Sequence, residues 1–265
     1  MRVGTTLISQ AVAVIELLAE EARPMRFADI TGRLELPKSS AHALLSALCE
    51  AAWVDQDADT GFYRLSLRFP VLGQRFITGM GLREVFQPVL DRLARESGEL
   101  ARLAIVEGHQ LMWTADAQGA HSGLIYQPIV NSVVAPHVTA HGRAWLATLP
   151  QEEAVKIVLA IGFGRPDDYG PRAIRSMDAL LRELERTRER GYGVVFEEAL
   201  PGIAAVAVAI RPHGGVAVGT VGVAGPIIRI DKARLPELVR VVRAASEDLA
   251  TLWPLRSLRP KPAGV

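Results

Sequence analysis

The order of short elements in the first sixty-odd residues limits the possible folds more than any other feature of the chain. Apolar residues recur at helical spacing, and two prolines, Pro24 and Pro37, interrupt that pattern. A polar, glycine-containing run then separates two short apolar stretches, as in a strand–turn–strand unit. The predicted elements are helices from Leu7 to Leu18, over 28–34 and over 39–51, and strands over 53–54 and 62–65.

Three helices and a hairpin within so short a segment predict a winged helix-turn-helix, which holds one helix rigidly enough to enter the DNA major groove by its N-terminal end. The third predicted helix opens with short or cationic donors, where phosphates and base edges would lie. The alternative is an ordinary three-helix cluster whose two serines merely cap a helix. The candidate DNA-contacting residues are Arg26, Lys38, Ser39, Ser40, His42 and Arg64.

Charge does not decide between these two interpretations. Residues 1–78 carry eight cations and nine anions, and the whole chain has a formal charge of +1, which excludes a uniformly basic coat. Any DNA contact must therefore use a local face, with dimerisation doubling the phosphate contacts. Aromatic residues make up 6% of the chain, which argues against a surface that stacks single-stranded bases.

Beyond residue 68 the pattern changes to a mixed α+β fold, in which helices cover a mostly antiparallel sheet. Prolines and glycines mark a connecting segment over 69–81, although 71–77 could be helical. An apolar stripe from Leu82 to Leu93 predicts an amphipathic helix, wide enough that we expect it to pack partly against a partner chain. The later elements are strands over 101–107, 111–117, 203–210 and 216–223 and helices over 141–148, 152–161, 177–190 and 235–252. The expected domains are 1–68 for DNA binding, 69–81 as linker, 82–254 for effector binding and oligomerisation, and 255–265 as a flexible tail.

Several classes of protein are excluded or disfavoured. No window reaches the roughly 18 uninterrupted apolar residues of a membrane helix, and the first residues do not resemble a secretory signal, so we expect a cytoplasmic protein. A single cysteine, Cys49, excludes an intrachain disulfide and a zinc site built on several thiolates, and we interpret it as a packed side chain. The sequence shows none of the common nucleophile or phosphate-loop motifs.

Six segments match one known family in the same order along nearly the whole chain. They are LPKSSAHALL at 36–45, TGFYRL at 60–65, LREV at 82–85, PHVTAHGRA at 136–144, RERGY at 188–192 and EEALPG at 197–202. Together these segments resemble the IclR family of bacterial transcriptional regulators. The resemblance implies a GAF-like C-terminal domain that binds a small metabolite, a homodimer or dimer of dimers, and a roughly palindromic operator in double-stranded DNA.

The sequence departs from the family pattern at two places. The family usually has arginine after the histidine of the recognition helix, where this chain has Ala43, so one DNA contact is in doubt. It also commonly has Arg-Cys where this chain has Ala204 and Ala205, which alters a strand that the resemblance places beside the ligand pocket. We interpret this loss of polar partners as favouring a more apolar effector.

A ligand cavity is one of two interpretations of the small residues in the last strands. One face of the 203–210 strand carries Ile203 and three alanines at alternate positions, and the next strand offers Gly219, Thr220 and Gly222. The space that small side chains leave above a sheet is filled either by a closely packed helix or by a ligand, and the alanines alone do not discriminate. The resemblance favours a ligand.

The start of the 141–148 helix would form a second wall, because unpaired N–H groups and the helix dipole attract a carboxylate, and Gly142 would allow close approach. Glu197 could accept a hydrogen bond from a ligand hydroxyl, or could simply be solvated. A tryptophan would suit an apolar body, so an aromatic acid or short oxo-acid is the effector class expected. The candidate effector residues are Trp113, His141, Gly142, Trp145, Glu197, Ala205, Ala207, Thr220 and Gly222.

His137 and His141 have the spacing of a two-histidine metal pair, but no glutamate lies between them, and we expect no metal, no cofactor and no catalytic residue. The favoured interpretation is an operator-binding regulator, of a catabolic operon, that responds to a small organic acid. The rival is a metabolic enzyme with an N-terminal helical interaction module, which would show turnover dependent on His137, His141 or Glu197.

Overall fold

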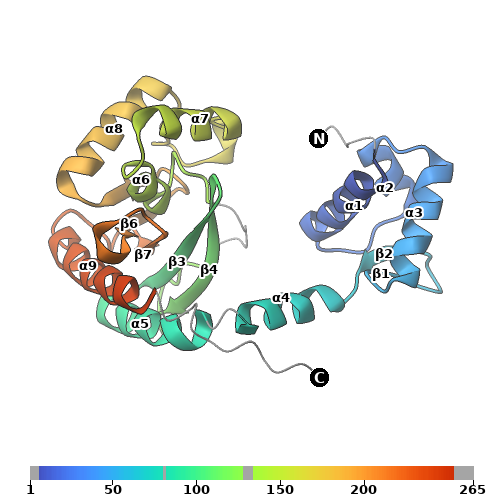
Figure 1. Ribbon diagram of the computed structural model, residues 1–265, viewed down its shortest axis with the longest axis horizontal. Coiled ribbons are helices and arrows are strands. Elements are labelled where there is room, and N and C mark those ends of the chain that lie inside the picture. Colours follow the sequence, from blue (N-terminus) through green and yellow to red (C-terminus); the bar gives the residue numbers. More distant parts are fainter. Residues whose placement is uncertain (1–5, 80–81, 128–133, 254–265) are drawn as a thin grey trace. The chain divides into compact units, whose positions relative to one another are not determined.

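The computed structural model describes residues 6–79, 82–127 and 134–253; for 74, 76–79, 82–84 and 166 it describes only the backbone. The chain divides into two compact units, Met1–Gly79 and Met80–Val265. Figure 1 shows helices and a small two-stranded sheet in the first unit, and a larger sheet with helices on both faces in the second. The predicted tail, 255–265, lies outside the described residues.

The first unit is the predicted winged helix-turn-helix. Its core comes from the apolar stripes of three helices together with one residue from each wing strand, such as Val14, Ile30, Leu45, Val54 and Tyr63. The wing strands pair antiparallel, with Asp55 opposite Arg64. The elements are α1 Leu7–Glu21, α2 Phe27–Leu34, α3 Lys38–Glu50, β1 Val54–Gln56 and β2 Tyr63–Leu65.

The connecting segment is helical over most of its length. Helix α4 (Arg68–Gly79) begins directly after the wing. Pro70 stands in its first turn, where the missing proline N–H breaks no intrahelical hydrogen bond, so the proline favours a helix start rather than a loop. This helix belongs to the first unit.

The second unit contains a five-stranded antiparallel sheet in the order β4-β3-β7-β6-β5. The predicted hairpin around Gly108 is present as β3 and β4, and the two alanine- and valine-rich runs pair as β6 and β7. The strands are β3 Leu100–Glu107, β4 Gln110–Gln118, β5 Gly193–Phe196, β6 Ile203–Ile210 and β7 Gly219–Pro226.

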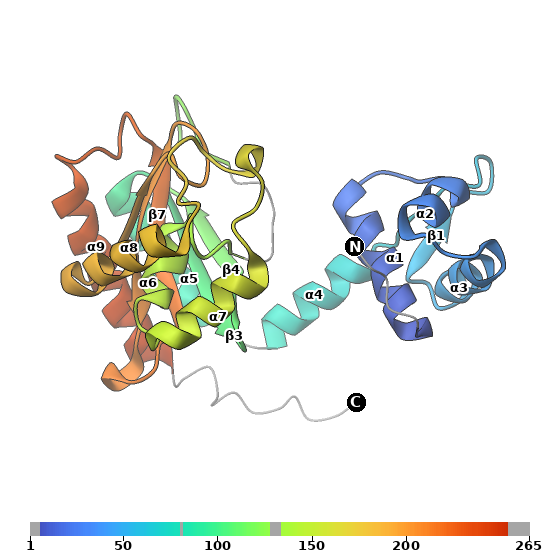
Figure 2. The ribbon, with the colours of Figure 1, turned by 90° about the horizontal axis from the view of Figure 1, so that it is seen from above.

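Helices cover both faces of this sheet (Figure 2). On one face lie α5 (Leu82–Ser97) and α9 (Leu235–Leu252), packed on residues such as Leu103 and Val221. On the other face lie α6 (Ala140–Leu146), α7 (Gln151–Ile161) and α8 (Met177–Arg190). Alternate strand residues therefore belong to different cores, as the period of two in a strand requires.

The α5 stripe is buried within its own chain, so the expectation that it packs on a partner is wrong for its described core residues. Phe86, Leu90 and Leu93 are at most 1% exposed in the core shared with α9 and the sheet. Phe86 also stacks on Trp253 with ring centroids 5.1 Å apart. The sequence showed a wide apolar face but not that α9 would cover it.

Candidate functional sites

The start of α3 presents polar side chains to solvent while its other face is buried. Lys38, Ser39, Ser40 and His42 are exposed, whereas leucines on the opposite stripe pack against the first two helices. The residue that caps α3 is Pro37, and no side-chain hydrogen bond closes this helix start. The two serines are therefore not capping residues, and their hydroxyls face solvent at the helix start.

The two candidate arginines flank the same small unit. Arg26 precedes α2 and lies over the Phe62 ring at the wing, with its guanidinium carbon 5.3 Å from the ring centroid. Arg64 is on β2, 3.7 Å from a carboxylate oxygen of Asp55, and both side chains are exposed. An exposed pair of this kind is worth about 0–1 kcal/mol, so a phosphate can compete for Arg64.

A cavity of about 210 Å³ lies in the second unit on the α6 face of the sheet. Pockets for drug-sized ligands measure roughly 300–1,000 Å³, so this cavity suits a small metabolite. Its floor comes from β3, β4, β5, β6 and β7, and its sides come from the segments before α6, around Tyr126, around Tyr169 and around Leu200.

Three of the nine candidate effector residues line this cavity: Trp113, His141 and Ala205. Thr220 lies beneath it, where its hydroxyl is 2.8 Å from Nδ1 of His141 in a hydrogen bond. Burial lowers the pKa of His141 to about 3, so this imidazole is neutral at physiological pH. His141 therefore contributes a polar but uncharged wall.

The other five candidate residues are outside the cavity lining. Trp145 is 2% exposed in the core beneath α7 and α8. Ala207 packs against Ala144 of α6, and a side chain at Gly222 would clash with Ala207. The remaining two are Gly142, from the expected carboxylate site, and Glu197, the expected acceptor for a ligand hydroxyl, and both are described next.

Groups of the protein itself already occupy the expected carboxylate site at the start of α6 and already bind Glu197, the expected acceptor for a ligand hydroxyl. The Thr139 hydroxyl caps α6 by accepting from the Gly142 N–H at 3.1 Å, and a Cβ on Gly142 would lie 2.2 Å from the Cα of Pro136. Glu197 accepts from the Gly202 N–H at 3.2 Å and lies 3.6 Å from Arg172. Pro136 makes the close contact that the absence of a side chain at Gly142 allows. This glycine is therefore needed for packing within the protein.

The two histidines with metal-pair spacing lie in different environments. His137 precedes α6 and stands edge-on between Phe163 and Tyr169, each 5.1 Å away, and burial lowers its pKa to about 4. His141 contacts Trp113 instead, at 4.6 Å. Within residues 6–79, 82–127 and 134–253, no group of three histidine, cysteine, aspartate or glutamate side chains is arranged to hold a metal.

Sequence reasoning missed one cavity residue with distinctive chemistry, Arg102 on β3. Its guanidinium carbon lies 3.5 Å from the centroid of the Trp113 ring, and the side chain lines the cavity. The available signal was a single cation inside the apolar strand 100–106, at a position that alternates with Ala101 and Leu103 of the opposite core. A single arginine in an otherwise apolar strand indicates a side chain that binds something on that face of the sheet.

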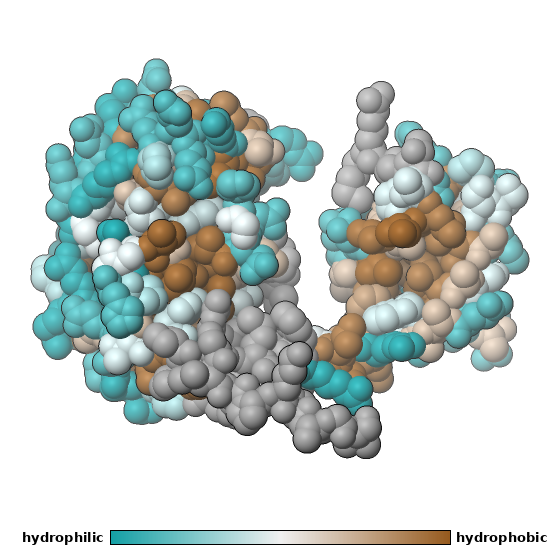
Figure 3. Space-filling model, in the orientation of Figure 1, coloured by the Kyte–Doolittle hydropathy of each residue, from teal (hydrophilic) through white to brown (hydrophobic). Residues whose placement is uncertain are grey.

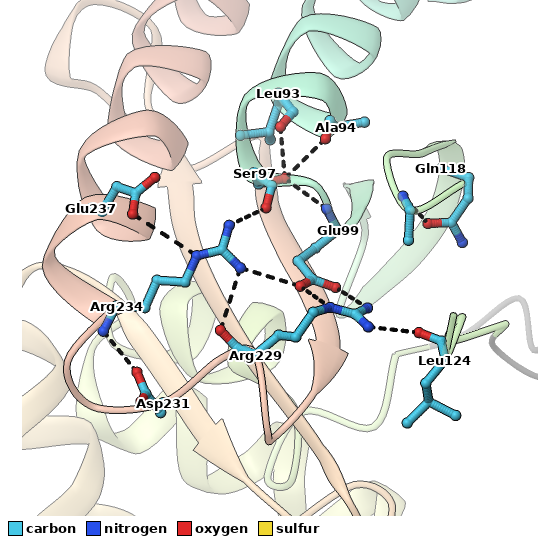
Figure 4. Close-up of polar contacts among 11 residues, drawn as sticks. Leu93, Ala94, Ser97, Glu99, Gln118, Leu124, Arg229, Asp231, Arg234 and Glu237 are labelled. Atoms are coloured by element: carbon cyan, nitrogen blue, oxygen red, sulfur yellow. Dashed lines mark hydrogen bonds and ion pairs between the residues drawn. The ribbon is translucent and has the colours of Figure 1, made fainter. Parts of the chain in front are cut away.

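The loop that carries Tyr126 into the cavity wall is held by a buried carboxylate (Figure 4). Glu99, 1% exposed, accepts from Nε of Arg229 at 2.7 Å and from Nη1 of Arg234 at 3.3 Å. Arg229 also donates to the Leu124 carbonyl at 2.8 Å, two residues before Tyr126. This cluster thereby ties the cavity loop to the junction of α5 and β3.

The two alanines that stand where the family commonly has Arg-Cys, Ala204 and Ala205, lie on opposite faces of the sheet. Ala204 is fully buried in the core beneath α5 and α9, whereas Ala205 borders the cavity. Only the second alanine therefore removes a side chain from the cavity wall. Ala43, the other departure, is exposed on α3.

Two family models match the chain. The IclR helix-turn-helix domain matches residues 8–58, and the bacterial transcriptional regulator IclR C-terminal domain matches residues 74–251. In the described part of the chain, no helix is long and apolar enough to cross a membrane.

Relatives and solved structures agree with this assignment. The HTH-type transcriptional repressor AllR of Salmonella typhi is 29% identical over 253 residues, which cover 96% of this chain and 92% of that protein. Its counterpart in Escherichia coli K12 is 28% identical with the same coverage. An IclR regulator from Alicyclobacillus acidocaldarius has the same fold, with a TM-score of 0.78, 21% identity, and coverage of 93% and 98%. An IclR homologue from Microbacterium hydrocarbonoxydans, complexed with 4-hydroxybenzoate, has a TM-score of 0.77, 21% identity, and coverage of 94% and 100%.

The family match decides between the two interpretations of the sequence, because it spans both units and describes a regulator in each. The rival, a metabolic enzyme with a helical interaction module, is set aside on this ground. The chain belongs to the IclR family of DNA-binding transcriptional regulators.

Proposed function

We propose that this protein represses a catabolic operon, and that a small organic acid bound in the α6-side cavity changes its affinity for a roughly palindromic operator. The observation that carries the proposal is the separation of two sites on two compact units: an exposed polar face on α3 and the wing, and a cavity in the sheet domain. A repressor role is supported by the AllR relatives, which are named as repressors. A DNA-bound regulator acts in the cytoplasm, at the nucleoid.

The proposed DNA contacts are made by Lys38, Ser40 and His42 at the start of α3, with Ser39, Arg26 and Arg64 beside them. All six side chains are exposed, and the apolar face of α3 fixes the helix start in place. Because the first unit has no excess of cations, two copies are needed to collect enough phosphate contacts. A palindromic operator and a symmetric dimer satisfy this need together.

A homodimer, or a homotetramer built from it, is therefore part of the proposal. Figure 3 shows apolar surface over the α1 region of the first unit, where Leu7, Ile8 and Val12 are 66%, 78% and 45% exposed. A second copy of the chain would cover this apolar surface. Light scattering at micromolar concentration should give at least a dimer, and a monodisperse monomer would contradict this part of the proposal.

The test of DNA binding uses fluorescence anisotropy with DNA from the region upstream of the gene and with fragments selected from a random pool. Lys38→Ala should weaken binding across sequences and reduce the salt slope by about one unit, because one phosphate contact is lost. Lys232→Ala, an exposed lysine of the second unit, is the matched control and should leave both quantities unchanged. If a folded variant with alanine at 38, 40 and 42 binds as tightly as wild type, the recognition helix is wrongly assigned.

The effector proposal is supported by the cavity's size, its three aromatic side chains and its small apolar floor. Thermal-shift screening of aromatic and short oxo-acids should identify a compound that raises the melting temperature by mass action and alters operator affinity. The 4-hydroxybenzoate complex of the Microbacterium homologue makes that acid a sensible first compound. If neutral compounds alone bind in the cavity, the effector is not an acid.

A further inference from the structure

The cavity has one cationic side chain among its described lining residues, Arg102. Of the other ionisable lining residues, His141 is neutral because burial lowers its pKa to about 3, and burial raises the pKa of both Tyr126 and Tyr169. Asp168 is the acid of this group. The positive charge available to a bound molecule therefore comes from the guanidinium on β3.

Arg102 lacks a polar partner within the part of the chain that the structure describes. Its Nε is buried without a hydrogen-bond acceptor, and neither an ion pair nor a hydrogen bond joins the guanidinium to a carboxylate. Asp116 stands opposite it in the β3–β4 register but is exposed and makes no ion pair with it. The Arg102 residue is only half-buried, but its Nε–H is removed from water, which costs free energy unless that N–H finds an acceptor.

The position of the guanidinium is fixed by aromatic packing rather than by charge. It lies over the Trp113 ring at 3.5 Å, a cation–π contact that orients the planar group and leaves its N–H edges free. Gly222 of β7 stands opposite Arg102 in the β3–β7 register, so no cross-strand side chain contacts the arginine stem at this position. The group is thus held in place before any ligand arrives.

The remaining walls suit an apolar body rather than a second polar group. Val195, Ala205 and Ala224 form adjacent positions of β5, β6 and β7 on the cavity floor, and Ile203 and Leu200 extend this surface. At the Asp168 end, hydrogen bonds from the Arg165 backbone and side chain lower the pKa of the aspartate and keep it ionised. A second negative charge on the ligand would be repelled there.

We propose that the effector is a small monocarboxylate with an apolar or aromatic body, and that Arg102 is the residue that binds its carboxylate. This inference rests on the proposed function, because it assumes that the cavity is the effector site. It replaces the expected anion site at the start of α6, where Thr139 and Pro136 occupy the position. The arginine fork pairs with both carboxylate oxygens, and Trp113 stacks beneath the pair.

The experiment measures binding of four matched probes to the full-length protein by calorimetry and by quenching of its tryptophan fluorescence. The probes are 4-hydroxybenzoate and phenylacetate, the neutral amide 4-hydroxybenzamide, and the dicarboxylate terephthalate. At least one monocarboxylate should bind, and the amide and the dicarboxylate should bind at least about thirtyfold more weakly, because the first loses the charge pair and the second meets Asp168. Equal binding of acid and amide, or binding by none of the four, would overturn the proposal.

Arg102→Met keeps an apolar stem beside Trp113 but removes the guanidinium. It should lower the affinity for the acid by at least about thirtyfold. Arg102→Lys should keep part of the affinity, because it restores the charge without the fork. Arg182→Met makes the same chemical change at an exposed position of α8 and is the matched control. Unchanged acid binding by a folded Arg102→Met would contradict the assignment.

Operator binding, measured without any acid, separates this inference from the proposed function. If Arg102→Met binds operator like wild type but no longer responds to the acid, both stand. If wild type binds operator and the acid affinity is unchanged by Arg102→Met, only the arginine assignment fails. If wild type binds no operator at all, the proposed function fails, and the calorimetric result with Arg102→Met still decides whether the cavity is an Arg102-dependent carboxylate site.

Discussion

Arg143 and Glu198 form a buried ion pair that joins α6 to the loop after β5. The Arg143 side chain is 2% exposed, and its two terminal nitrogens each donate to a different oxygen of Glu198, one of them at 2.9 Å. Arg143 also donates to the carbonyls of His137 and Val194. The pair therefore fixes the segment before α6, which borders the cavity, against the strand that forms part of the floor.

Glu198→Gln should lower the free energy of unfolding of the second unit by about 3 kcal/mol, because the buried Arg143 charge loses its hydrogen-bonded carboxylate and keeps only Glu183, at 3.8 Å. Glu197→Gln is the control at the neighbouring position, where the Arg172 partner is 65% exposed and the pair is worth at most about 1 kcal/mol. Urea unfolding followed by circular dichroism compares the two. An equal decrease in the free energy of unfolding in the two variants would show that the Arg143 pair stabilises the protein no more than the Arg172 pair does.

Ala43→Arg should raise operator affinity severalfold at low salt and steepen the salt dependence by about one unit, because it adds a cation on the exposed face of α3 near the phosphates. Ala47→Arg adds the same charge one turn later on the same helix, further from the end that enters the groove. Its effect should be smaller. A salt slope that does not change in Ala43→Arg would argue that α3 does not approach the backbone at this position.

The buried histidines should make the second unit sensitive to acid. Burial holds the pKa of His137 at about 4 and that of His141 at about 3, whereas both return to about 6.5 in the unfolded chain. Between pH 6.5 and pH 4 the unfolded chain takes up these two protons and the native chain does not. Each histidine should therefore lower the free energy of unfolding by about 1.4 kcal/mol per pH unit as the pH falls through this window. Above pH 6.5 both histidines are neutral in the folded and the unfolded chain, so none of this stability is lost there.

Unfolding measured from pH 7 to pH 4.5 tests this dependence. His137→Asn should reduce the slope of the free energy of unfolding against pH by the amount that corresponds to one proton, whatever the substitution does to the absolute stability. His213→Asn is the control, since that histidine is exposed and asparagine tolerates its left-handed backbone, with φ of 52°. The same slope in wild type and in His137→Asn would mean that this histidine does not stay neutral in the folded protein.

Glu99→Gln should weaken the cluster in Figure 4 that holds the loop before Tyr126. It leaves Arg229 and Arg234 without their shared carboxylate, and because both arginines are about 30% exposed the expected cost is about 1–2 kcal/mol. Glu96→Gln changes an exposed glutamate of α5 and should have little effect. Hydrogen exchange should show faster exchange around Leu124 in Glu99→Gln alone; unchanged exchange there would mean that the loop is held by other contacts.

The sequence by itself determined most of the elements and their order, but the short strand β5 (Gly193–Phe196) was not predicted. Helical spacing in α1, α2 and α3 and turn residues in the wing act locally, so a period of 3.6 or 2 reveals which residues are buried. The same local rule identified the two hairpin-like pairs of the larger sheet and the helix that closes it. The exposure of the residues proposed to contact DNA could also be predicted, because a polar stripe opposite a leucine stripe on one helix is visible without any tertiary contact.

Only the tertiary structure decided what lies above each small residue of the sheet. Ala205 and Ala207 are alike in sequence and share one face, yet the first borders the cavity and the second packs against α6. Gly142 looked like a ligand approach and instead receives Pro136, while Arg102 looked like an ordinary strand residue and faces the cavity over Trp113. Periodicity says which side of an element is covered, but the partner that covers it comes from distant parts of the chain and is chosen by packing.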